Sequence, residues 1–206
     1  NEIKHFDKFL KSINYFLNKE NVSILIIKRK HKNFHARFSA KMRIYNYIII
    51  NRLSGPVLEK NKGWHVIKKL NVELMKKGAK KLVGKKDFST FRASSCRAKT
   101  PIKTMKMAKI KSSKDKIEIE FRSQSFLQQQ VRSMVGCLKY VGEKKWSLKK
   151  FEGIMKSKKE FYALLLHHQK DFIYLELFIN FFLLLIANFL FSLHLDSSRT
   201  IYPQQF

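Results

Sequence analysis

The feature that most constrains the fold is an abrupt change in charge and hydropathy near residue 160. Residues 1–160 carry 41 basic and 12 acidic side chains, a net charge of +29, whereas residues 161–206 carry two basic and three acidic ones. The second part includes the run FIYLELFINFFLLLIANFLFSLHL at 172–195, which is charged only at Glu176 and is long enough to cross a bilayer. We therefore expect a basic domain over residues 1–160 and a separate apolar tail over residues 161–206.

The first 160 residues alternate between helical and strand patterns. Helices are predicted at 6–17, 71–84, 126–141 and 148–157, where apolar residues recur three and four positions apart. Strands are predicted at 23–30, 42–51, 102–111 and 116–121, and KSSKDK supplies turn residues between the last two. Asn71 and Ser147 stand at N-cap positions. This order predicts a mixed α+β architecture.

Composition narrows the classes of partner and cofactor. A net charge of +28 is far more than solubility requires, and it predicts a polyanionic partner. Cys96 and Cys137 lack metal-ligand spacing and are too few for a disulfide framework, which fits a reducing cytoplasm. No signal peptide pattern opens the chain at Asn1. The sequence also has no glycine-rich cofactor loop.

Four separated blocks carry a family resemblance. They are FHARFSAKMRIYNYIIIN (34–51), LVGKKDFSTFRASSC (82–96), KTPIKTM (99–105) and SFLQQQVRSMVGCLKYVG (125–142). In order and spacing they resemble bacterial tRNA pseudouridine synthase A, over about residues 5–160. The resemblance implies a pseudouridine synthase fold, here incomplete, with a mixed or antiparallel sheet flanked by helices. It also implies a homodimer that isomerises uridine to pseudouridine in the anticodon arm of tRNA without a cofactor.

The resemblance implies roles for four residues. Arg132 corresponds to the arginine that pairs with the catalytic aspartate and keeps it ionised. Tyr45 corresponds to the active-site tyrosine, whose ring packs against the base and whose hydroxyl can take part in proton transfer. Arg43 and Arg37 would lie near phosphate or the active-site cleft. Without the resemblance, Arg132 would be interpreted as a residue at a helix's polar edge, and Tyr45 as a half-buried strand aromatic.

The family's nucleophile is an aspartate in a GRTDAGVHA loop, and residues 1–206 contain no such loop. Asp7, Asp87 and Asp115 do not stand in comparable surroundings. We therefore expect the polypeptide 1–206 alone to make no pseudouridine.

The C-terminal residues also depart from the family pattern. Family members end with a strand of the type APPxGLYLxxV, whereas residues 163–177 read ALLLHHQKDFIYLEL. When the third base of each codon is read with the first two of the next, Leu164–Glu176 can encode a segment of the family type. We therefore expect a frameshift close to residue 162. Residues 161–206 would then be an out-of-frame, apolar helical tail, and no membrane insertion is expected.

Three alternatives stay open. The chain could be a catalytically silent RNA-binding fragment, which would need the same charge and no nucleophile. It could be a basic protein tethered to a membrane if residues 172–195 insert. A methyltransferase ranks last, because the glycine-rich cofactor loop is missing.

Overall fold

The computed structural model describes residues 5–20, 22–36, 38–57, 63–158, 173–179 and 182–185. Its helices are α1 (Phe6–Leu17), α2 (Val72–Leu82), α3 (Gln130–Gly142) and α4 (Leu148–Ser157), with short 3-10 turns η1 (Asn18–Glu20) and η2 (Ser89–Phe91). Its strands are β1 (Met42–Ile50), β2 (Trp64–His65), β3 (Gly84–Asp87), β4 (Ile102–Ser113), β5 (Lys116–Ser123), β6 (Ile173–Ile179) and β7 (Phe182–Leu185).

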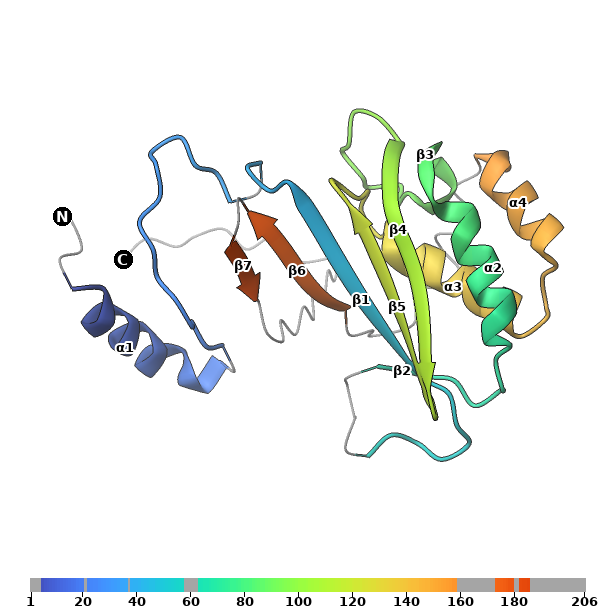
Figure 1. The fold of residues 1–206 in the computed structure, drawn as a ribbon, viewed down its shortest axis with the longest axis horizontal. Helices are drawn as coiled ribbons and strands as arrows, with labels where there is room; N and C mark the ends of the chain where they lie inside the picture. Colours follow the sequence, from blue (N-terminus) through green and yellow to red (C-terminus); the bar gives the residue numbers. More distant parts are fainter. Residues whose placement is uncertain are drawn as a thin grey trace, which may run out of the picture.

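The described strands form one mixed sheet in the order β3-β4-β5-β1-β6-β7, with the short β2 beside β1 (Figure 1). Strand β2 runs parallel to β1, and the other pairs are antiparallel. Helices α2, α3 and α4 gather beside β3, β4 and β5, and α1 lies apart at the other end of the molecule. The α+β class expected from the sequence is confirmed.

The hydrophobic core lies between one face of the sheet and helices α2, α3 and α4. Alternation along the strands sends Tyr47 and Ile49 of β1 to this face. The same buried cluster includes Ile119 and Phe121 of β5, Met75 and Leu82 of α2, Met134 and Leu138 of α3, and Phe151 of α4. The helices therefore fix which face of β1 points toward the interior.

Helix α1 has the predicted bounds, but none of its residues is buried. The Asn14 side chain donates to the Ile24 carbonyl (2.8 Å) and accepts from the Ile24 amide (2.7 Å), which ties the next segment to the helix. The strand predicted at 23–30 is wrong, because this segment pairs with no described strand and exposes Leu25 and Ile26. A β-branched run forms a strand only where a neighbouring strand supplies hydrogen bonds.

The other predicted elements of residues 42–157 are confirmed, with boundaries shifted by up to four residues. The Asn71 side chain accepts from Leu74 N at 2.9 Å and starts α2, and Ser147 accepts from Lys150 N at 3.1 Å and starts α4. Helix α3 begins at Gln130 rather than at 126, because Gln129 has a φ of +60° and interrupts the helical path. The strands β2 and β3 were not predicted.

The C-terminal part differs from the predicted helical tail. Residues 173–179 and 182–185 are strands, and β6 pairs along β1 with Leu175 opposite Tyr45. The expected boundary at 160 and the frameshift near 162 lie outside the described residues. In the described part of the chain, no helix is both long and apolar enough to span a membrane. Cys96 and Cys137 are buried free thiols.

Candidate active site

Tyr45 lies on β1 between two neighbouring strands, and its ring meets Phe126. The two ring centroids are 4.9 Å apart with planes at 79°, an edge-to-face contact. Burial raises the pKa of the Tyr45 phenol above its ordinary value, and the nearby Arg43 charge opposes this only in part. The phenol therefore keeps its proton at neutral pH and can donate a hydrogen bond.

Arg43 stands two positions before Tyr45 and so belongs to the same face of β1. Its guanidinium donates to the carbonyl of Gln124, the first residue after β5. Ser123, opposite Arg43 in the strand register, is buried, and its hydroxyl lies 2.8 Å from the carbonyl oxygen of Ser125. These contacts hold the segment 124–129 against the start of β1.

The segment 124–129 is also fixed from its other side. The buried Gln130 side chain accepts from Leu127 N at 2.8 Å, and the Ala93 amide donates to the Gln128 carbonyl at 3.2 Å. Phe126 therefore meets Tyr45 from a segment held by hydrogen bonds at several points. This segment leads directly into α3.

Arg132 lies in the first turn of α3, six positions after Phe126, and is half-buried. Its neighbours Val131 and Ser133 are buried. Arg132 makes no hydrogen bond, ion pair or cation–π contact with any residue that the structure describes. A half-buried guanidinium is costly to leave without an anionic partner, so this position suits an incoming carboxylate.

The three aspartates considered from sequence do not supply that carboxylate. Asp87 accepts from the Ser89 amide (2.9 Å) and hydroxyl (2.6 Å), and Asp115 pairs with Arg52 at 3.9 Å. Asp7 lies exposed on α1. Arg37 lies outside the described residues. Within the described ranges, no group of three or more His, Cys, Asp or Glu side chains could hold a metal ion.

Sequence reasoning missed two parts of this arrangement. The ring of Phe126 borders Tyr45, although the sequence suggested only a helical packing position. The Gln124 carbonyl accepts a hydrogen bond from Arg43. A pattern of residue types does not identify a backbone acceptor.

Comparison with known proteins shows which family this chain resembles. Residues 79–167 match the family model described as tRNA pseudouridine synthase. A tRNA pseudouridine synthase A of Pelagibacter ubique (strain HTCC1062) is 68% identical over 158 residues, which cover 77% of this chain and 64% of the relative. The chain is similar to tRNA pseudouridine synthase A.

Two further relatives that carry this family name are more distant. Identity is 43% over 136 residues with the protein of Paramagnetospirillum magneticum, covering 66% of this chain and 53% of that protein. It is 43% over 141 residues with the protein of Rhodospirillum centenum, covering 68% of this chain and 58% of that protein. The chain thus spans between half and two thirds of the length of these curated relatives.

Proposed function

We propose that this chain carries the tyrosine and arginine side of a tRNA pseudouridine synthase active site. The reaction is the isomerisation of uridine to pseudouridine in the anticodon arm. The observation that carries the proposal is the half-buried Arg132, which has no carboxylate partner among the described residues. It follows a segment whose Phe126 ring contacts the family's tyrosine position, Tyr45.

Each side chain has a distinct task in this proposal. Arg132 pairs with the family's catalytic aspartate and keeps that carboxylate ionised and oriented for attack. Tyr45 packs against the uridine after the base leaves the stack, and its protonated phenol can donate to it. Arg43 and Arg37 contact phosphate or border the cleft. No metal or organic cofactor takes part.

The partner in this proposal is tRNA. A net charge of +28 gives a long-range attraction to phosphates, with an affinity that falls steeply as salt rises. We further propose that the intact enzyme is a homodimer in the cytoplasm. Light scattering of the enzyme at several protein concentrations measures its mass and so tests whether it forms a dimer.

Residues 1–206 contain no GRTDAGVHA loop, so the polypeptide 1–206 should bind tRNA without converting it. Pseudouridine formed by purified 1–206 on unmodified tRNA would contradict this. The same assay separates a silent RNA-binding fragment from an active enzyme. The alternative of a membrane-tethered basic protein predicts that the expressed chain sediments with membranes.

The catalytic proposal is tested in a chimera that adds the GRTDAGVHA segment of a family member to this chain. Replacing Arg132 by Ala should lower kcat roughly 10²- to 10⁴-fold, because removing one partner of a buried charge pair costs about 3–5 kcal/mol. Binding of tRNA should change little. The control is Arg122→Ala, since Arg122 pairs with Glu120 on the sheet face away from Tyr45. Equal kcat for both variants would remove Arg132 from the mechanism.

A further inference from the structure

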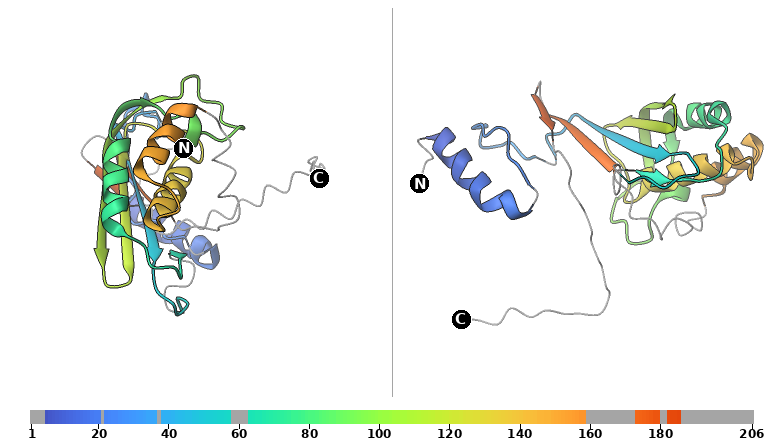
Figure 2. Two further views of the ribbon diagram at one scale, coloured as in Figure 1. Left: turned by 90° about the vertical axis from the view of Figure 1, so that its right-hand side faces the viewer. Right: turned by 90° about the horizontal axis from the view of Figure 1, so that it is seen from below.

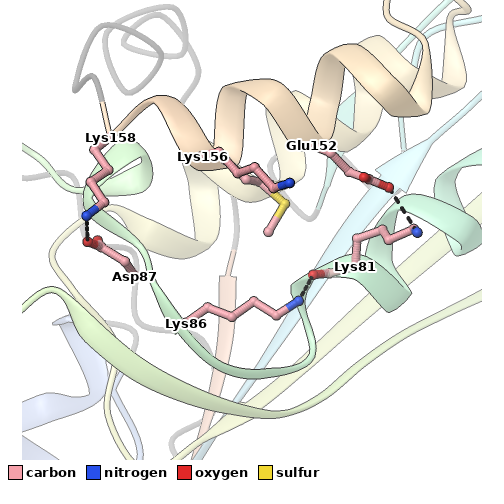
Figure 3. A pocket seen from close by; sticks show the side chains of 7 residues that line it. Lys81, Lys86, Asp87, Glu152, Lys156 and Lys158 are labelled. Carbon is pink, nitrogen blue, oxygen red and sulfur yellow. Dashed lines mark hydrogen bonds and ion pairs between the residues drawn. The ribbon is translucent and has the colours of Figure 1, made fainter.

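A cavity of about 460 Å³ lies between the end of α2, strand β3 and α4, outside the site described above. Its lining residues are Lys81, Lys86, Asp87, Glu152, Met155, Lys156 and Lys158. Four ammonium groups and two carboxylates therefore surround one concave space. Figure 3 shows Lys156 reaching in from α4 and Lys86 from the opposite wall.

The two carboxylates are already neutralised by lysines. Lys81 Nζ lies 2.9 Å from Glu152 Oε1, and Lys158 Nζ lies 3.4 Å from Asp87 Oδ2 (Figure 3). Two ammonium groups remain in excess. Lys86 donates to the backbone carbonyl of Lys81, and Lys86 and Lys156 both lie near enough to Glu152 to help lower its pKa, although neither forms an ion pair with it.

This excess charge favours an anion in the cavity. Two ammonium groups that face one space repel each other, and an anion between them reverses that repulsion. Oxygen atoms of a phosphate group can accept hydrogen bonds from both lysines at once.

The sheet register places the cavity at the same end of the sheet as Tyr45. Gly84 of β3 pairs with Met105 of β4, Met105 with Ser123 of β5, and Ser123 with Arg43 of β1. Lys86 lies two residues beyond Gly84, toward the end at which Arg43 contacts Gln124. Three strand spacings, about 15 Å, and four residues along the strands, about 13 Å, separate Lys86 from Tyr45, or about 20 Å in all.

A nucleic-acid strand in a double helix presents one phosphate about every 3.4 Å along the helix axis, so about 20 Å corresponds to about six phosphates. We propose that the cavity between α2, β3 and α4 binds backbone phosphates of the same RNA that enters the Tyr45 site, through Lys86 and Lys156. This inference rests on the proposed function. It assigns a second point of contact, away from the reacting base.

The test compares two double variants of the full chain in tRNA binding over a range of salt concentrations. Lys86→Gln with Lys156→Gln removes the two excess charges from the cavity. Lys77→Gln with Lys149→Gln is the matched control, because both lysines are exposed and neither lines the cavity. Thermal unfolding verifies that both variants are folded.

The slope of log Kobs against log[salt] should become shallower by roughly 1.4–1.8 in the cavity variant, since each of the two lost phosphate contacts removes about 0.7–0.9. The control variant should change this slope much less. In acetylation footprinting of the unaltered chain, bound tRNA should protect Lys86 and Lys156 more than Lys149.

The outcomes separate this inference from the proposed function. If the unaltered chain binds tRNA but both double variants give the same slope, or Lys86 and Lys156 gain no protection, the cavity does not bind phosphate and the proposed function is untouched. If the unaltered chain shows no salt-dependent tRNA binding, the proposed function and this inference fail together.

Discussion

At the scale of single residues, the pairing of buried charges distinguishes the candidate site residue Arg132 from the structural residue Glu143. Arg132 is half-buried without a described partner, whereas Glu143 at the end of α3 is buried with two partners. Lys139 Nζ lies 2.7 Å from Glu143 Oε1, and Lys145 Nζ lies 3.2 Å from Oε2. Lys139 also lies over the ring of Trp64, 5.6 Å from its centroid. A buried charge is tolerated in a fold when ionic partners surround it, and one without such partners is available for binding.

The Glu143 pair should make stability depend on acid pH. Burial raises the pKa of this carboxyl, but the hydrogen bonds from Lys139 and Lys145 outweigh it, and the net pKa lies below the ordinary 4.5. The stabilisation is therefore complete above pH 4.5 and is lost as the pH falls below it. Glu143→Gln should lower the free energy of unfolding by about 1–3 kcal/mol at pH 7 and by much less near pH 3. Urea denaturation at both pH values measures this, and a difference that does not depend on pH would contradict it.

The sequence could predict Tyr45 and Arg132 as site candidates because each stands inside a recognisable motif. It could not predict the lysine-lined cavity, whose walls come from three elements that are distant in sequence. Lys86 and Lys156 are 70 positions apart and look like any other lysine of a basic chain. The structure distinguishes Lys86 and Lys156 from the other lysines of the cavity, because Glu152 and Asp87 form their ion pairs with Lys81 and Lys158.

At the scale of elements, the helices were predictable because their signals are local. The caps Asn71 and Ser147 and the apolar spacing identify α2 and α4 without knowledge of the partner surface. Strands depend on neighbours, so the β-branched run at 23–30 did not become one, and the two-residue β2 gave no pattern at all. The start of α3 was misplaced because a positive φ at Gln129 is set by the loop around it.

Two helical glycines should respond in opposite ways to alanine. A Cβ at Gly153 of α4 would meet nothing within 4 Å, whereas one at Gly142 of α3 would lie 2.8 Å from the Cγ and Sδ atoms of Met75. Gly153→Ala should stabilise by roughly 0.5–1 kcal/mol through helix propensity. Gly142→Ala should destabilise by about 1–3 kcal/mol through overpacking. Thermal unfolding of both variants measures the signs, and two stabilising substitutions would show that Met75 moves aside freely.

At the scale of the whole molecule, the described chain has two regions of different packing. The sheet and helices α2, α3 and α4 share one core, while α1 contributes no buried residue and lies apart (Figure 2). The order of the strands in the sheet could not be predicted from the sequence, because no residue pattern in β1 identifies β5 and β6 as its neighbours. The α+β class could be predicted from the sequence, because it depends only on which helices and strands occur.

The difference in packing predicts the order of proteolysis. Phe38 is 75% exposed, whereas Phe88 and Phe91 are fully buried. Chymotrypsin should therefore cut the native chain after Phe38 well before either buried phenylalanine, because cleavage needs a locally opened backbone. Mass spectrometry of the early fragments measures this. Early cleavage at Phe88 or Phe91 would show that the core opens as readily as the N-terminal region.

The placement of β1 has a consequence for how the site can be lost. This strand has β5 on one side and β6 on the other, and it carries both Tyr45 and Arg43. Moving either side chain by shifting the backbone would require breaking hydrogen bonds on two flanks at once. Thermal fluctuations that open the N-terminal region therefore leave Tyr45 and Arg43 in register, and their placement is lost only when the sheet itself unfolds.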